Sequence, residues 1–254
     1  MYRFLIKPKW LLFHLFCVLM MVAMVNLGLW QLRRLDERRD FNATVKARTE
    51  QEVVPLDDIV PPGEVADTHQ LEYRPVEVSG SYLPDLSYER SVRRDDMAGR
   101  DLFGVLQLDD GSIVVVNRGW LSDGIPSPAL PEGTVRLVAR LRVSATNGTG
   151  QVGDTGTEPM TIFRVDVRAI GDDAGAQPRA MYVERITSDP AEPAEMTPVP
   201  FPDLGEGPHF GYAVQWFLFT LGVVVCWALA VARKVGELKN PPDPNAIDPD
   251  APAY

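Results

Sequence analysis

The chain has 254 residues, with 25 basic and 35 acidic side chains and a formal net charge of −10 at pH 7. This acidic balance, without a basic stripe, argues against a nucleic-acid-binding protein. The 2 cysteines, Cys17 and Cys226, both fall in apolar segments, so the polar middle of the chain has neither a disulfide nor a thiolate metal site.

The first predicted element is an apolar segment at residues 10–32, which carries no charged side chain. At ~1.5 Å per residue, a helix of this length crosses the ~30 Å hydrocarbon core of a membrane. A cleavable signal peptide is the alternative. It needs a shorter apolar core and a small-x-small cleavage site, whereas this apolar run continues through Trp30. We therefore expect a retained membrane anchor.

A second apolar segment at residues 209–232 predicts another crossing, so residues 1–9 and 233–254 lie on the same side of the membrane. The second of these termini is polar and Pro-rich, and we expect it to be disordered. Basic residues flank both outer sides of the hairpin, which indicates cytoplasmic termini. They are Arg3, Lys7, Lys9, Arg233, Lys234 and Lys239. Residues 33–208 are then extracytoplasmic, on the periplasmic face of a cell membrane or across the inner mitochondrial membrane of a eukaryote.

Four arginines directly after the first crossing oppose this orientation, because positive charge usually stays on the cytoplasmic side. They are Arg33, Arg34, Arg38 and Arg39. The rule is weak for long loops, so a long acidic domain can be translocated regardless. Attraction to anionic lipid headgroups is one explanation for these arginines.

The polar middle begins with helical spacing at residues 32–48 and then becomes a series of strands. The strands are short, rich in β-branched residues and bounded by turn signals. They are expected at residues 75–82, 88–92, 103–108, 112–117, 135–143, 162–167 and 181–186. A Gly/Thr-rich loop at 144–158 and a Pro-rich linker at 187–207 complete the domain.

No long helical segment separates the strands, and residues 109–111 read Asp-Asp-Gly, which is typical of a hairpin turn. Antiparallel pairing is therefore more consistent with the pattern than a parallel sheet. The predicted fold class is a membrane α+β protein. Its two transmembrane helices flank an outer-face, antiparallel β-rich domain, which forms an open sheet or a barrel.

At the second crossing, His209, Tyr212 and Trp216 recur at helical spacing, and Trp30 and Arg33 do so at the first. In the predicted topology both sets lie at the outer membrane surface. A histidine, aromatic walls and arginines suit a flat, apolar, anionic cofactor such as haem. The alternative is an interfacial aromatic belt with snorkelling arginines and a capping histidine, and spacing alone leaves both open.

His14 lies at the opposite end of the first crossing, so it cannot ligate the same iron as His209. Roughly 20 residues at ~1.5 Å each would separate the two side chains by about 30 Å. We expect His14 to form an interfacial or inter-helix hydrogen bond.

Within the polar domain, an apolar strand ends in Asn117-Arg118-Gly119-Trp120. One interpretation is a polar rim that faces the membrane or a partner. The other is a structural strand end, with a buried tryptophan and an arginine paired to a carboxylate.

The polar domain has no nucleophile–base pattern, no Gly-x-Ser-x-Gly elbow and no cluster of metal ligands at the usual spacing. Its single histidine, His69, has no assigned role. We therefore expect a protein that is not an enzyme.

Four segments in order resemble the surfeit-locus-protein-1 family of cytochrome c oxidase assembly factors. They are residues 27–34 (LGLWQLRR), 78–82 (VSGSY), 116–120 (VNRGW) and 209–217 (HFGYAVQWF). Their order, and the arrangement of helix, large domain and helix, agree over nearly the whole chain. Residues 121–124 depart from the family's usual sequence, so partner contacts do not transfer there.

The resemblance implies a membrane assembly factor, a chaperone of the respiratory chain, that helps deliver or insert haem a into the haem-bearing catalytic subunit of cytochrome c oxidase. It implies a transient haem a cofactor with His209 as the iron ligand. The other expected cofactor residues are Tyr212, Trp216, Trp30, Arg33 and Arg34, whereas Gln31 and residues 117–120 belong to a partner or structural motif. The alternative is a structural accessory or scaffold protein of the oxidase or a respiratory supercomplex, without a cofactor.

Overall fold

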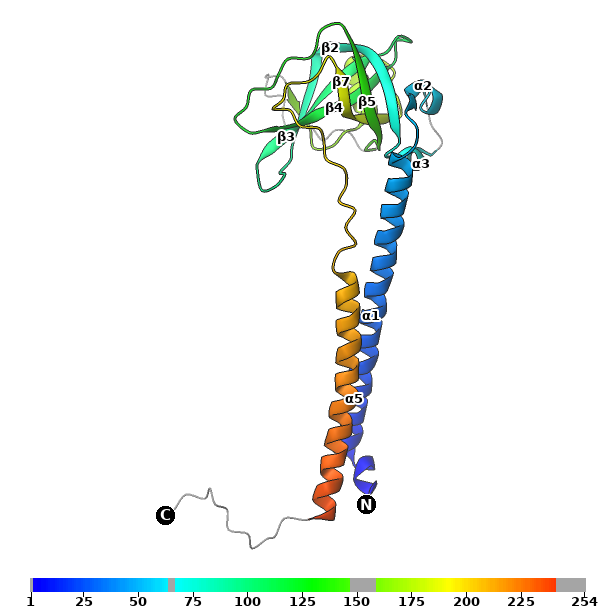
Figure 1. The fold of residues 1–254 in the computed structure, drawn as a ribbon, viewed down its shortest axis with the longest axis vertical. Helices are drawn as coiled ribbons and strands as arrows, with labels where there is room; N and C mark the ends of the chain where they lie inside the picture. The colour runs from blue at the N-terminus through cyan, green and yellow to red at the C-terminus, as the bar shows by residue number, and fades with distance from the viewer. Residues whose placement is uncertain (1, 64–66, 147–158, 241–254) are drawn as a thin grey trace, which may run out of the picture. The chain divides into compact units, whose positions relative to one another are not determined.

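The computed structural model describes residues 2–63, 67–146 and 159–240 (Figure 1). Most of the predicted loop at 144–158, and the predicted tail beyond residue 240, lie outside the described residues. The chain forms two compact units. We call Met1–Asn42 with Leu204–Tyr254 the helix unit, and Ala43–Asp203 the barrel unit.

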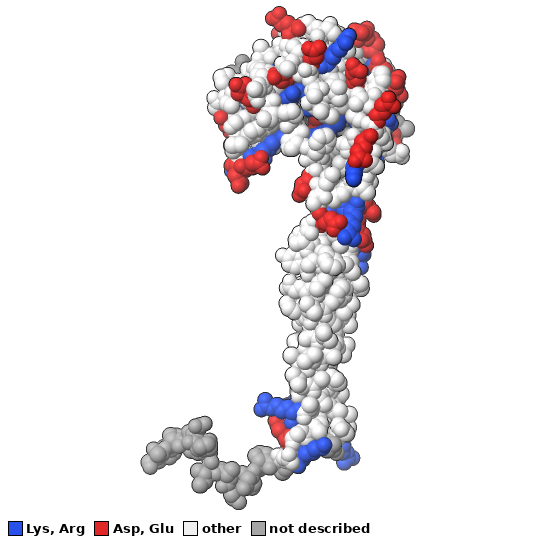
Figure 2. All heavy atoms as spheres, viewed as in Figure 1, with Lys and Arg blue, Asp and Glu red and all other residues white. Residues whose placement is uncertain are grey.

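The helix unit contains the short 3₁₀ helix η1 (Tyr2–Ile6), the long helix α1 (Pro8–Thr49) as far as Asn42, and helix α5 (His209–Lys239). Both long helices contain apolar stretches sufficient to cross a membrane. Many of their large apolar side chains are exposed, and Figure 2 shows no charged side chain along the middle of the pair. Such a surface is costly in water and favourable in hydrocarbon, so the helix unit is compatible with a two-pass membrane protein.

The ends of both helices differ slightly from the apolar segments. Helix α1 continues well beyond its apolar stretch, as the helical spacing at residues 32–48 predicts. Helix α5 runs through Lys239, so the first residues of the predicted disordered terminus, 233–239, are helical. Arg233 and Lys234 there both pair with Glu237, at 3.3 and 2.9 Å.

Inside the helix unit, α1 and α5 run antiparallel and approach closely at Gly28. A Cβ atom at Gly28 would lie 2.8 Å from the ring of Phe217 on α5, so this crossing requires a residue without a side chain. Leu35 and Ala213 are buried in the same unit, with exposed fractions of 2% and 1%. The small residues Gly28 and Ala213 therefore allow the two helices to pack directly against each other.

The barrel unit is built on a closed ring of five strands in the order β2-β3-β4-β7-β5, which returns to β2. The strands are β2 (Pro75–Ser91), β3 (Gly99–Gln107), β4 (Ile113–Ser122), β5 (Thr134–Val143) and β7 (Met181–Asp189). Two-residue strands β1 (Val54–Pro55) and β6 (Met160–Thr161) add to β2, and α2 (Leu56–Ile59), α3 (Thr68–Leu71) and α4 (Val167–Ala174) complete the unit.

The β-rich prediction is confirmed, with corrections to how the strands pair. Of the two predicted alternatives, an open sheet or a barrel, the chain forms the barrel, which closes because β2 is long enough to pair with β3 along one part and with β5 along another. It is not wholly antiparallel either, since β4 and β7 pair in parallel, as do β1 and β6 with β2. The predicted hairpin is present between β3 and β4, and Gly111 there has a φ of 81°.

Two strand predictions need revision. The expected strands at 75–82 and 88–92 are one strand, β2, whose register shifts between Tyr82 and Ser87. The expected strand at 162–167 is wrong: Ile162 and Val165 are buried without joining a ladder, and helix α4 follows. The Asp166 side chain accepts from the backbone N–H groups of Arg168 and Ala169, which starts the helix.

Strand β4 is apolar on both faces because it separates two cores. Val114 and Val116 pack in the barrel interior, whereas Ile113 and Val115 pack with residues of α4 and of the segment before it. This double burial accounts for the continuous apolar run that marks β4 in the sequence.

We expect Leu137→Ala to lower the free energy of unfolding of the barrel unit by about 2–5 kcal/mol, because it leaves a cavity in the barrel interior. Leu137 is 1% exposed and belongs to the interior core. Denaturant unfolding of the detergent-purified protein, followed by near-ultraviolet circular dichroism, measures this loss. Arg136→Ala, at an exposed position on the same strand, is the control and should change stability by less than about 0.5 kcal/mol. Equal effects of the two substitutions would contradict the assignment of Leu137 to the core.

Candidate functional site

The candidate site is at the end of the helix unit where α5 begins, which we call the His209 end. His209 is the first residue of α5, and its Nδ1 lies 2.8 Å from Oε1 of Gln31 on α1. The carbonyl oxygen of a glutamine only accepts, so Nδ1 carries the proton and donates. The neutral imidazole then keeps a lone pair on Nε2, which is the form that ligates a metal.

Gly207, two residues before His209, lies beside the Nε2 edge of the His209 ring. Gly207 has a φ of 69°, and a Cβ atom there would lie 3.5 Å from Nε2. A Cβ atom at this distance is in ordinary van der Waals contact with the ring, so the demand for glycine at 207 comes from the backbone conformation.

The predicted aromatic residues lie on the two helices that carry His209 and Gln31. Tyr212 and Trp30 are 48% and 45% exposed, whereas Trp216 is half-buried. At ~100° per residue, Trp30 is about 100° around α1 from Gln31, so it lies to one side of the contact. The structure thus brings Gln31, rather than Trp30, directly to His209.

The two predicted arginines are placed differently. Arg33 is about 200° around α1 from Gln31, on the opposite face, and it forms no ion pair with any residue that the structure describes. Arg34 is one turn after Gln31, on the same side, and pairs with Glu37 at 2.7 Å. Of the two, only Arg34 is near the side of α1 that carries the contact with His209.

Two further arginines on α1 hold the segment that leads into α5. Arg38 Nε donates to the carbonyl oxygen of Gly205 at 3.0 Å, and Arg39 donates twice to the Glu206 carboxylate, at 3.0 and 2.9 Å. Hydrogen bonding from Arg39 lowers the pKa of Glu206. Sequence reasoning assigned these arginines no site role, although Arg38 follows Gln31 by two helical turns and therefore shares its face.

His14 is at the other end of the helix unit, which we call the His14 end. Trp227 Nε1 donates to His14 Nδ1 at 2.9 Å. Trp227 and His209 are separated along α5 by roughly 27 Å, at ~1.5 Å per residue. The structure therefore confirms that His14 makes an inter-helix hydrogen bond and is far from His209.

In the barrel unit, the Asn117–Trp120 segment matches the structural interpretation. Arg118 donates to both carboxylate oxygens of Glu192, each at 2.7 Å, and only 3% and 1% of the two side chains are exposed. Asn117 Oδ1 accepts from the backbone N–H of Gly119 at 3.1 Å, and the Trp120 indole donates to the carbonyl of Val92 at 3.0 Å. These residues are buried, so they hold the barrel together and do not form an exposed rim.

Tyr82 packs beside this ion pair, with the Arg118 guanidinium 5.8 Å from its ring centre. Its hydroxyl is buried and has no hydrogen-bond partner among the described residues. Burial raises the pKa of Tyr82, and Glu192 raises it further, while Arg118 and Arg185 act in the opposite direction.

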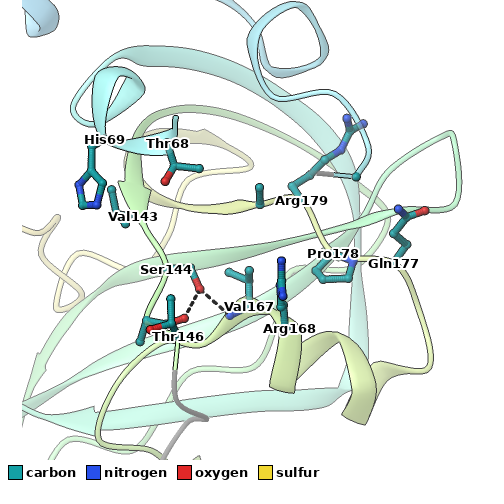
Figure 3. Close-up of a pocket in the computed structure, with 13 residues that line it drawn as sticks. Thr68, His69, Val143, Ser144, Thr146, Val167, Arg168, Gln177, Pro178 and Arg179 are labelled. Atoms are coloured by element: carbon teal, nitrogen blue, oxygen red, sulfur yellow. Dashed lines mark hydrogen bonds between the residues drawn. The ribbon is translucent and has the colours of Figure 1, made fainter. Parts of the chain in front are cut away.

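The barrel unit also has a pocket of about 740 Å³, between the end of β5, the start of α4 and the approach to β7 (Figure 3). Ser144 accepts a hydrogen bond from the Val167 backbone N–H at 3.0 Å and donates to the Ala145 carbonyl at 2.9 Å. His69 lines this pocket, but none of the predicted site residues does. Residues 64–66 and 147–158, which adjoin its lining, are outside the described residues, so we assign it no ligand.

These features define a class of protein with two candidate membrane helices, one before and one after a closed five-stranded barrel in the sequence. The second helix begins with a histidine that is hydrogen-bonded to a glutamine of the first. The chain belongs to the SURF1 family, whose model matches residues 18–221. The predicted resemblance is therefore confirmed.

Similar proteins occur in bacteria and eukaryotes. An uncharacterised SURF1-like protein of Mycobacterium tuberculosis is 26% identical, over 85% of this chain and 81% of its own length. A SURF1-like protein of Monosiga brevicollis is 29% identical, over 87% and 89%. The surfeit locus protein 1 of Xenopus tropicalis is 25% identical, over 89% and 76%. Each match covers most of both chains.

We expect Tyr82→Phe to change stability little at pH 7 and to increase it above about pH 10, where tyrosines of the unfolded chain ionise. Because the folded-state pKa is raised, the folded chain keeps a proton that the unfolded chain loses, so the wild type loses stability as pH rises. The substitution should reduce this slope by up to about 1.4 kcal/mol per pH unit. Denaturant unfolding at pH 8 to 11 measures it. A slope unchanged by the substitution would contradict the effect of burial on Tyr82.

Proposed function

We propose that this protein is a membrane assembly factor for cytochrome c oxidase. In this proposal it holds haem a transiently at His209 and helps deliver it to the haem-bearing subunit. The observation that carries the cofactor part is the hydrogen bond from His209 Nδ1 to Gln31, which leaves Nε2 with its lone pair. The oxidase as partner rests on membership of the SURF1 family.

Each residue of the His209 end has a separate role in the proposed haem binding. His209 supplies the axial nitrogen, and Gln31 fixes the tautomer and the orientation of its ring. Arg34 can pair with a propionate, because guanidinium groups bind carboxylates in two-pronged fashion. Trp30 and Tyr212 present exposed aromatic surface that can pack against the macrocycle.

A single histidine ligand suits transfer better than permanent storage. The only other histidine of the described helix unit, His14, is at the opposite end, so no second histidine from this unit can complete the coordination of the iron. An iron with one protein ligand dissociates more readily than one with two, and this favours passing the haem to an acceptor that supplies more ligands. The function proposed is therefore binding and transfer, and not catalysis.

We also propose a two-pass orientation with cytoplasmic termini and an extracytoplasmic barrel unit. Basic residues before α1 and at the end of α5 support it, because such residues are retained on the cytoplasmic side. The His209 end would then be at the outer surface of the membrane, the depth at which an extracytoplasmic acceptor site could be reached.

We expect His209→Ala to abolish haem binding while the protein remains in the membrane, because the substitution removes the iron ligand. The measurement is the optical spectrum of detergent-purified protein co-expressed with haem a synthesis. His14→Ala is the matched control: it removes a histidine from the same helix unit, and the haem band should remain.

Loss of the band in both variants would indicate a general effect of the helix unit, and would contradict the assignment of His209. No band in the wild type, with the oxidase still co-purifying in stoichiometric amounts, would favour a scaffold without a cofactor.

We expect Gln31→Leu to speed haem release by about 10- to 100-fold, because loss of the hydrogen-bond acceptor frees the ring of His209. Gln31→Glu retains an oxygen acceptor and should keep slow release. Its charge should also make the imidazole a stronger donor to iron and lower the haem midpoint potential. Transfer of haem to an excess of a scavenger protein measures the rate. Equal rates in both variants, with an unchanged potential, would show that Gln31 does not position His209.

A further inference from the structure

The His14 end of the helix unit contains a pocket of about 300 Å³, far from the proposed haem site. Its lining is almost wholly apolar and comes from η1, α1 and α5. The lining residues are Leu5, His14, Cys17, Val18, Met21, Val224 and Trp227. The volume is at the lower end of the range of small-molecule sites, about 300–1,000 Å³, so it can accept a single ring.

The hydrogen bond to Trp227 determines which nitrogen of His14 carries the proton. An indole N–H can only donate, so His14 Nδ1 must accept. The neutral ring therefore carries its proton on Nε2, and no described residue accepts a hydrogen bond from it. The pocket thus offers one N–H donor within an apolar lining.

This arrangement is the reverse of that at His209, where Nε2 keeps the lone pair. A metal ion would need that lone pair, which His14 does not have at Nε2. A charged ligand is disfavoured too, because no Asp, Glu, Lys or Arg side chain lines the pocket. The complementary ligand is neutral and apolar, and carries an oxygen acceptor.

Aromatic rings surround His14, and one of them, Trp227, lines the pocket. The ring centres of Trp10, Phe13 and Trp227 are 5.8, 6.1 and 6.0 Å from that of His14. Phe4 of η1 packs edge-on against Trp10 at 4.8 Å, which holds η1, and with it Leu5, beside the pocket. Rigid aromatic surfaces are well suited to pack against another planar ring.

We propose that this pocket binds the head group of a membrane-soluble quinone, whose carbonyl oxygen accepts a hydrogen bond from His14 Nε2. A quinone combines a flat neutral ring with a carbonyl acceptor, which are the two features that the pocket complements. A lipid acyl chain would fill the volume but has no acceptor for the N–H of His14. This site is independent of the proposed function at His209.

The two cysteines provide a direct binding assay on the full-length protein. Cys17 lines the pocket and is buried, whereas Cys226 is exposed on α5, so it is an internal reference. The probe is tetramethyl-1,4-benzoquinone, whose ring positions are all substituted, so thiols do not add to it. Ether-linked phospholipid nanodiscs exclude ester carbonyls as competing acceptors.

At a quinone concentration ten times the dissociation constant, alkylation of Cys17 by N-ethylmaleimide should slow by about 10-fold, and that of Cys226 should not change. Tetramethylbenzene has the same shape without carbonyls and should protect Cys17 at least about 5-fold less well at the same concentration. Equal protection by the two compounds, or none by the quinone, would overturn the proposal. Both comparisons use the wild-type protein, so they do not depend on how a variant folds.

The variants test the donor itself. His14→Phe keeps a flat ring but removes the N–H, and should weaken quinone binding by about 10-fold. His209→Phe makes the same change at the other end and should leave quinone binding unchanged, even where haem is lost. Unchanged binding in His14→Phe would overturn the proposal. The haem and quinone sites can therefore fail separately.

Discussion

The close packing of α1 against α5 is the constraint on which both helix-unit sites depend. With Gly28 against Phe217, the register of the two antiparallel helices is set. Gln31 then falls opposite His209 on one side of this crossing, and His14 falls opposite Trp227 on the other. A larger residue at 28 would separate the helices and lengthen both hydrogen bonds. A small residue with no chemistry of its own thus aligns both histidines with their partners.

The barrel unit depends on buried charge as much as on its apolar cores. Arg118 is paired with Glu192, and Arg140 with Glu184 at 2.6 Å, all with almost no exposure. Removing one partner of such a pair leaves an uncompensated buried charge, which costs about 3–5 kcal/mol. The Asn117–Trp120 segment, which matches a family motif, is therefore structural. Its residues bind the segment that follows β7, through Glu192 and Thr197, and hold it against β4.

The helices and most strands could be predicted from the sequence because each depends on a local pattern, namely an uncharged run at residues 10–32 or the β-branched run that became β5. Barrel closure could not, because it requires β2 to pair with both β3 and β5. The pairing of Arg118 with Glu192 joins distant positions and has no local signal.

At the candidate site, helical spacing identified His209 as a site residue, but it predicted that Arg33 and Trp30 of the first helix lie beside it. Only the register of the helix pair shows that Gln31 faces His209.

The two histidines of the helix unit show how one neighbour decides what an imidazole can do. A glutamine oxygen beside Nδ1 of His209 draws the proton there and leaves Nε2 able to bind iron. An indole N–H beside Nδ1 of His14 drives the proton to Nε2 and turns that nitrogen into a donor. The difference is one of tautomer, set by the group that faces Nδ1. The two imidazole rings are chemically identical. Replacing Trp227 by a residue that accepts a hydrogen bond, and Gln31 by one that donates, should therefore exchange the ligand preferences of His14 and His209.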